Sequence, residues 1–241
     1  MNIYYKNRIK TASLNSPQSD LVMPLNNLYD DYLGLLAGFT GSNAVITGVW
    51  PFPESVFVSS LCIGLTNAMN YTLALFDVNE EQIYSSGQKN TGFNKIEILD
   101  FPGMMVEKFI LELSGDENIT LGLLYLGDKL ELPRFSPGPA YNHDFTSEAE
   151  RSMGGYAFGL RKTRLVTFSA GFPRVDNRNR KIIEEYMDET LNVQPHVIDP
   201  YPEAREEFPP FYGTLTHGFP GTKRAENGFY WDFELEWMEC K

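Results

Sequence analysis

Large apolar and mostly acidic side chains alternate strictly in the segment before the C-terminal Cys-Lys. Phe229, Trp231, Phe233, Leu235 and Trp237 alternate with Tyr230, Asp232, Glu234, Glu236 and Met238. A side-chain period of two is typical of a β-strand with one buried and one hydrated face. Burial of large apolar side chains contributes about 1.5–3 kcal/mol each. We therefore expect residues 229–239 to form a strand inside a sheet that closes the fold.

Short β-prone runs separated by turn-forming residues fill the first half of the chain. Clusters of Gly, Pro, Asn and Asp stand between these runs. Regular spacing of short strands and turns is typical of a two-sheet sandwich or a barrel. The expected strands are residues 44–49, 56–65, 71–76, 82–84, 95–99, 109–113 and 121–126.

A change of composition at residues 133–155 marks the expected boundary between two domains. This segment is rich in proline and glycine and has little periodicity, which is typical of a linker or strap. We therefore predict a β-sandwich at 1–132, a strap at 133–155 and a smaller α+β domain at 156–241.

One convincing helix is predicted in the second domain, from residue 176 to about 191. Asp176 or Asn177 would cap its start, and Asn192 would end it. A 3.6-residue period of apolar positions supports the helix. These positions are Ile182, Ile183, Tyr186, Met187 and Leu191.

Charge and cysteine content exclude several classes of protein. The net charge of −12 opposes general binding to nucleic acid or to an anionic membrane. No apolar stretch reaches the length of a membrane span, and the N-terminus lacks the apolar core of a secretory signal. The two cysteines are too few for a disulfide framework, and Cys62 is expected to be a small buried hydrophobe. We expect the chain to fold in a reducing cytoplasm.

Motifs that carry catalysis are missing from the sequence. None of the three histidines has a His or Cys at metal-ligand spacing, and no nucleophile elbow, phosphate loop or dinucleotide fingerprint occurs. His143, next to Asp144, and His196, near Asp199, are interpreted as solvated or locally hydrogen-bonded. The sequence predicts no catalytic residue, cofactor or metal.

Two glutamates of the C-terminal strand allow two interpretations. Glu234 and Glu236 share the face opposite Trp231 and Phe233. A pair of carboxylates on one face is compatible with acid–base catalysis. We favour the other interpretation, a hydrated outer face of the sheet.

A run of cations surrounds the start of the predicted helix. Seven cations and one anion, Asp176, lie between residues 161 and 181. The cations form either a solvated face or a contact patch for an acidic partner protein, which includes another copy of this chain. They are Arg161, Lys162, Arg164, Arg174, Arg178, Arg180 and Lys181.

A stiff aromatic loop, Trp50-Pro51-Phe52-Pro53, joins two expected strands. If Trp50 and Phe52 are exposed, they can stack on a sugar or anchor a partner. The alternative is that the aromatic residues plug the core under the loop.

The order of several segments along the chain carries a resemblance to known proteins. These segments are residues 24–30, 58–67, 71–77 with 83–87, 109–113 with 119–127, 161–172, 197–200, 212–215 and 233–239. In this order they resemble a family of bacteriophage and prophage tail proteins of the tail tip or baseplate. The likeness covers nearly the whole chain, and the first half is also similar to discoidin-like (galactose-binding-like) jelly rolls.

This resemblance implies a mainly β protein, with an N-terminal jelly-roll sandwich followed by a smaller α+β domain. It implies a non-enzymatic structural component of a tail tip that acts through protein–protein assembly, made in the bacterial cytoplasm and carried in the virion tail. The implied partners are other tail proteins, the chain itself and surface carbohydrate, without nucleic acid or membrane. No ligand residue of discoidin-like domains maps onto this sequence.

Two other functions remain open. One is a carbohydrate-binding module through which the tail recognises a cell surface. The other is an enzyme acting on polysaccharide, which requires convergent carboxylates beside a groove.

Overall fold

The computed structural model divides the chain into two compact units. The sandwich unit comprises Asn2–Glu131 and Val197–Pro210, and the sheet unit comprises Leu132–His196 and Phe211–Cys240. The structure describes all residues except 31–34, 52–53, 93–95, 137–138, 146–147, 152–156, 161–163, 192–193, 224–229 and 241. It describes only the backbone of 143–145, 148–151, 157–160, 164 and 219–223.

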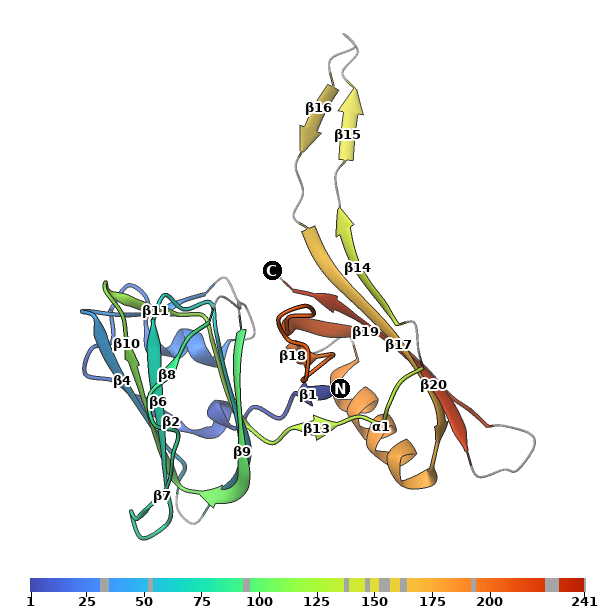
Figure 1. Cartoon of the computed structure of the whole chain (residues 1–241). Coiled ribbons are helices and arrows are strands. Elements are labelled where there is room, and N and C mark those ends of the chain that lie inside the picture. Colours follow the sequence, from blue (N-terminus) through green and yellow to red (C-terminus); the bar gives the residue numbers. More distant parts are fainter. Residues whose placement is uncertain are drawn as a thin grey trace. The chain divides into compact units, whose positions relative to one another are not determined.

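Two antiparallel sheets form the body of the sandwich unit (Figure 1). One has the strand order β2-β4-β10-β6-β7, with β8 also paired to β6, and the other has the order β12-β5-β9. The strands are β2 (Ser13–Asn15), β4 (Asn43–Val49), β5 (Val56–Gly64), β6 (Asn70–Phe76), β7 (Gln82–Ser85), β8 (Lys89–Asn90), β9 (Ile96–Val106), β10 (Lys108–Ser114) and β12 (Leu123–Gly127).

Shorter elements complete the sandwich unit. β3 pairs with β11, and β1 pairs with both β13 and β18. The bounds are β1 (Asn2–Tyr4), η1 (Arg8–Thr11), η2 (Leu25–Tyr29), β3 (Ala37–Phe39), β11 (Ile119–Leu121), β13 (Leu130–Glu131) and β18 (His196–Asp199), of which Val197–Asp199 lie in this unit.

The core of the sandwich unit follows from alternation along its strands. Every second residue of β6 is buried, and β10 shows the same pattern. Ile46, Leu73 and Leu111 from one sheet belong to the same buried cluster as Val58 and Leu124 from the other. The predicted mainly β fold, a sandwich followed by a smaller α+β unit, is confirmed.

Four antiparallel strands in the order β19-β20-β17-β14 form the main sheet of the sheet unit. β20 lies between β17 and β19, and its Phe233, Leu235 and Trp237 are buried. The predicted C-terminal strand is therefore confirmed, although Phe229 lies outside the described residues. The elements are β14 (Ala140–Phe145), β15 (Glu148–Arg151), β16 (Ala157–Leu160), β17 (Arg164–Val175), α1 (Asn177–Thr190), β19 (Phe211–Lys223) and β20 (Trp231–Glu239).

The predicted helix forms as α1 and begins at the predicted cap. The Asp176 carboxylate accepts a hydrogen bond of 2.8 Å from the backbone N–H of Asn179, which satisfies a free donor of the first turn. Ile183, Tyr186 and Met187 are buried. A Cβ at Gly218 of β19 would lie 2.5 Å from Met187 Cε, so the missing side chain there lets the helix approach the sheet.

A two-stranded antiparallel ribbon extends from this sheet (Figure 1). β14 pairs with β17, and further along the ribbon β15 pairs with β16. Part of the segment expected to be a strap, residues 133–155, thus forms strands. A ribbon is held by backbone hydrogen bonds, so its sequence needs no buried face and no alternation.

Candidate functional site

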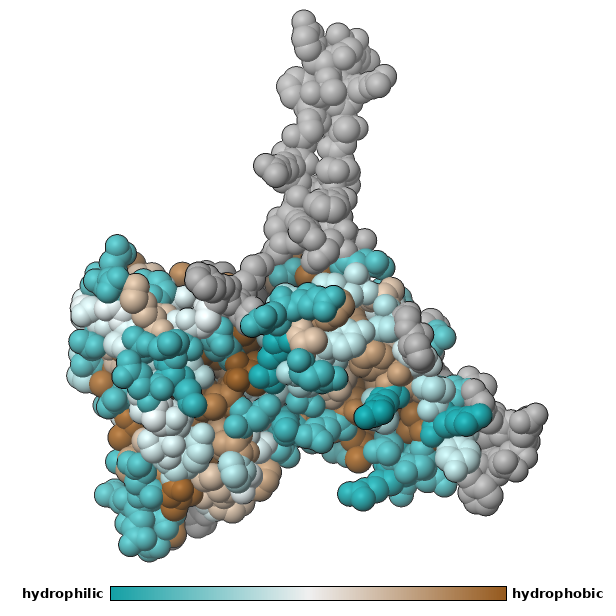
Figure 2. Space-filling model, in the orientation of Figure 1, coloured by the Kyte–Doolittle hydropathy of each residue, from teal (hydrophilic) through white to brown (hydrophobic). Residues whose placement is uncertain are grey.

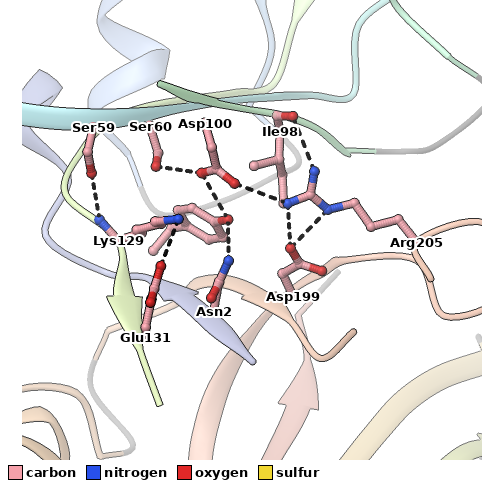
Figure 3. A network of polar contacts seen from close by, with 10 residues as sticks. Asn2, Ser59, Ser60, Ile98, Asp100, Lys129, Glu131, Asp199 and Arg205 are labelled. Atoms are coloured by element: carbon pink, nitrogen blue, oxygen red, sulfur yellow. Dashed lines mark hydrogen bonds and ion pairs between the residues drawn. The ribbon is translucent and has the colours of Figure 1, made fainter. Parts of the chain in front are cut away.

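Arg205 is at the centre of a polar network in the sandwich unit (Figure 3). Its Nε and Nη2 donate to Asp199 Oδ2 over 2.9 and 2.7 Å. Nη2 also lies 3.4 Å from Asp100 Oδ2, and Nη1 donates over 3.5 Å to the carbonyl of Ile98. Two guanidinium nitrogens thus share one carboxylate oxygen in a charge-assisted contact.

Asp100 of β9 connects this ion pair to the start of the chain. Its Oδ1 accepts hydrogen bonds from Ser60 Oγ at 2.7 Å and from the Tyr4 hydroxyl at 3.4 Å. Asn2 Nδ2 donates over 3.5 Å to the same hydroxyl. The network therefore joins β1, β5 and β9 to the segment Val197–Pro210.

A second group of polar contacts borders this network. Ser59 Oγ donates to Asp128 Oδ1 over 2.7 Å and accepts from the backbone N–H of Lys129 over 3.3 Å. Lys129 Nζ pairs with Glu131 at 2.8 Å. The contacts of Ser59 join the chain between β12 and β13 to β5, next to Ser60 of the network.

Burial sets the electrostatics of the network. The Asp199 side chain is fully buried, and burial raises its pKa although the hydrogen bond from Arg205 acts to lower it. Its Oδ1 has no hydrogen-bond partner among the described residues. Burial also raises the pKa of the Cys62 thiol, which opposes formation of a reactive thiolate. The arrangement suits a structural ion pair that fastens chain segments together.

A second buried polar chain lies in the sheet unit. Trp237 Nε1 donates over 2.7 Å to the Tyr186 hydroxyl, which is 2.7 Å from His196 Nε2. His196 Nδ1 lies 2.9 Å from the carbonyl of Gln194, so this nitrogen carries the proton. Nε2 then accepts from Tyr186, and every group in the chain is satisfied.

The buried position of His196 in this hydrogen-bonded chain predicts that the protein loses stability in acid. Burial lowers the pKa of His196 from 6.5 to about 4, so the unfolded state takes up a proton first as the pH falls below about 6.5. We expect the free energy of unfolding to fall by about 3 kcal/mol from this group between pH 7 and pH 4. Urea unfolding of the wild type and of His196→Gln at both values measures it.

In His196→Gln, the free energy of unfolding should lose the part of its pH dependence that comes from His196. The matched control is His217→Gln, since His217 has a side chain that is 64% exposed. An equal pH dependence in the wild type and in His196→Gln would contradict the assignment.

The outer face of the sheet unit contains a pocket of about 270 Å³. Glu234 and Glu236 border it, opposite the small residues Ser169 and Gly171 of β17. Glu236 Oε2 also lies 3.5 Å from His217 Nδ1. The structure therefore brings together the two carboxylates that the sequence placed on one strand face.

The predicted cationic patch is only partly described. Arg161 and Lys162 lie outside the described residues, and so does the side chain of Arg164. Arg180 packs over the Trp231 ring at 4.5 Å and lies 3.5 Å from Glu184, so it is held within its own unit. The exposed members are Arg174, Arg178 and Lys181.

The aromatic loop does not present Trp50 to solvent. Trp50 is only 1% exposed, packs on Phe109, and donates from Nε1 to the Arg8 carbonyl over 2.9 Å. It is a core residue, the alternative that the sequence left open. Phe52 lies outside the described residues.

Sequence reasoning missed the Arg205 network. Arg205 lies in a charged, proline-rich segment, residues 199–210, and the sequence indicates no partner for it there. Asp100 is 105 residues away in the chain, and no local pattern relates the two residues. An aspartate directly after the apolar pair Val197-Ile198 was the one available signal.

The described part of the chain contains neither a cluster of metal ligands nor a helix that could cross a membrane. No group of three or more His, Cys, Asp or Glu residues there is arranged to hold a metal ion. No helix in that part is both long and apolar enough to cross a membrane.

Comparison with known proteins gave no family. No family model and no curated protein matches the chain. A fucose-binding module of Streptococcus pneumoniae has 12% identity and a TM-score of 0.43, over 50% of this chain and 96% of the module. Chitosan-binding module 1 of a Paenibacillus chitosanase/glucanase has 10% identity and a TM-score of 0.42, and the match covers 51% of this chain and 98% of the module. The lectin domain of lectinolysin, complexed with Lewis b antigen, has 8% identity and a TM-score of 0.43, and the match covers 52% of this chain and 98% of the domain.

These structural neighbours are carbohydrate-binding modules, and each matches about half of this chain. Nothing in the comparisons points to a phage tail family.

Proposed function

We propose that this protein is a non-enzymatic recognition component of a larger protein assembly. In this proposal the sandwich unit binds carbohydrate, and the sheet unit contacts partner proteins. The observation that carries the carbohydrate half is an exposed apolar pair on the sandwich unit, formed by Phe57 and Met105.

Phe57 of β5 and Met105 of β9 are cross-strand partners that are 41% and 52% exposed. The Phe57 ring lies over Gly103, where a Cβ would come within 2.2 Å of Phe57 Cζ. Figure 2 shows hydrophobic patches among hydrophilic surface on the sandwich unit. An exposed ring on a rigid sheet gives the apolar face of a sugar a platform for stacking.

Glycan binding tests this half of the proposal. On a glycan array, Phe57→Ala should reduce the affinity of the wild-type ligands by about tenfold, because the stacking surface is lost. Ile83→Ala is the matched control, since Ile83 is 40% exposed on β7 of the other sheet. Unchanged binding by Phe57→Ala, or an equal loss in both variants, would refute the platform.

The ribbon favours the second half of the proposal, contact with partner proteins. β15 and β16 pair only with each other among the described strands. An isolated two-stranded ribbon is marginally stable in water, and its outer edges carry unpaired backbone groups. A protein partner that pairs with or covers these edges would stabilise it.

Shortening the ribbon tests this contact. Phe145 and Arg164 are cross-strand partners, so an Asn-Gly turn in place of residues 146–163 closes the hairpin. We expect this variant to fold with an unchanged melting temperature and to lose association with partner proteins in size-exclusion chromatography with light scattering. Undiminished association would contradict the role of the ribbon.

The sequence resemblance leads us to propose a phage or prophage tail tip as the assembly. The protein would be made in the bacterial cytoplasm and act in the virion tail, where its sandwich unit would bind cell-surface carbohydrate. Its partners would then be products of neighbouring tail genes. Co-purification with those products tests this, and a failure to bind any of them would argue for another assembly.

A further inference from the structure

The pocket on the outer face of the sheet unit has a floor of small residues. Ala140, Ser169 and Gly171 lie along neighbouring positions of β14 and β17. The backbone N–H of Ser136 donates over 2.7 Å to the carbonyl of Gly171, which fixes one wall. Glu234 of β20 stands on the opposite side.

Gly171 is open toward this pocket. A Cβ built on Gly171 would meet no atom closer than the Phe233 carbonyl oxygen at 4.0 Å. Glycine weakens the interior of a strand, and it often marks a place where a ligand or another backbone approaches closely. The register of β17 shifts just after this position, between Phe172 and Val175, and the space over Gly171 is open to a group that enters the pocket.

The chemistry of the lining selects the ligand. Glu234 and Glu236 contribute two carboxylates, and Ser136 and Ser169 contribute hydroxyls. No residue that lines the pocket, within the described part of the chain, is aromatic or cationic. The volume of about 270 Å³ is below that of sites for drug-sized molecules. A single lysine or arginine side chain fits these properties, because its charge pairs with the carboxylates and its extended stem covers the small floor.

We propose that this pocket receives an exposed cationic side chain from a second copy of this chain, supplied by Arg174, Arg178 or Lys181. The inference deepens the assembly half of the proposed function and rests on it. Local charge complementarity supports the choice of occupant, since these exposed cations and the two carboxylates of the pocket lie on the same unit. A pocket on one copy and a cation on the next give a head-to-tail contact that can close into a ring.

Sedimentation velocity on the full chain tests the contact. We expect the wild type to self-associate and Gly171→Val to weaken association at least about tenfold, because the valine takes up space over the pocket floor without changing charge. Valine favours strands, so the melting temperature should stay the same or rise. Asp188→Asn, on the exposed side of α1, is the control and should associate like the wild type.

A charge swap identifies the occupant. Glu234→Lys/Glu236→Lys and Arg174→Glu/Arg178→Glu/Lys181→Glu should each stay monomeric, while their mixture should form a complex through the reversed pair. A monomeric wild type, an unaffected Gly171→Val or a mixture without a complex would each overturn the inference. The proposed function would still stand if shortening the ribbon abolished binding to other partners.

Discussion

Replacement of Trp237 by alanine is expected to lower the free energy of unfolding of the sheet unit by about 3–5 kcal/mol. Trp237 is fully buried, and its ring packs on Phe168 with the centroids 5.6 Å apart. Its Nε1 also donates to the Tyr186 hydroxyl. The substitution therefore leaves a cavity and removes one bond of the buried Trp-Tyr-His chain.

Denaturant unfolding followed by circular dichroism measures this loss. Trp231→Ala, on the same strand, is the control because Trp231 is only half-buried, and it should cost about 1 kcal/mol. Trp237→Phe keeps most of the packing and loses the N–H. Its loss of unfolding free energy should therefore lie between those of Trp237→Ala and Trp231→Ala. Equal losses in Trp237→Ala and Trp231→Ala would show that the strand is not anchored by its buried face.

Replacement of Arg205 by alanine is expected to destabilise the sandwich unit by about 3–5 kcal/mol, since it leaves the buried Asp199 carboxylate without its partner. Without the guanidinium, the already raised pKa of Asp199 should rise further. A carboxyl with a raised folded-state pKa is tolerated in acid, and its unfavourable contribution grows as the pH rises through that pKa. The difference in unfolding free energy between the wild type and Arg205→Ala should therefore become smaller at acidic pH.

A double variant separates the charge from the packing. Arg205→Ala/Asp199→Asn should recover a large part of the lost stability, because it removes the unpaired charge. Guanidinium unfolding of the single and double variants at pH 7 and pH 5 gives the comparison. A double variant that is no more stable than Arg205→Ala would mean that the loss comes from the packing of Arg205 and not from the unpaired charge of Asp199.

The sequence predicted the elements whose side chains alternate against a core. Leu73 and Leu75 are buried at every second position of β6, and the same rule located Phe233 and Trp237. Asp176 located the start of α1 because capping is a local interaction. In these cases the physical cause lies within a few residues, so a single sequence contains it.

Features that depend on distant pairing could not be predicted. The partners of Arg205 come from β9 and from the end of β18, and the pocket forms only when β17 and β20 place Gly171 opposite Glu234. The ribbon was missed for another reason, because a paired ribbon needs no alternation of apolar and polar residues unless one face packs on a core. The sequence placed Glu234 and Glu236 on one face, but it contained no sign of a hollow beside them.

Because the chain leaves the sandwich unit after Glu131 and re-enters it at Val197–Pro210, no single cut separates two self-sufficient fragments. A fragment that ends at residue 131 retains Asp100 and lacks both Arg205 and Asp199, so Asp100 and the Ile98 carbonyl of β9 lose their contacts with the guanidinium. Exchange of this module between proteins would thus require two insertion points. A truncation that keeps the sandwich unit intact should therefore retain both Asn2–Glu131 and Val197–Pro210.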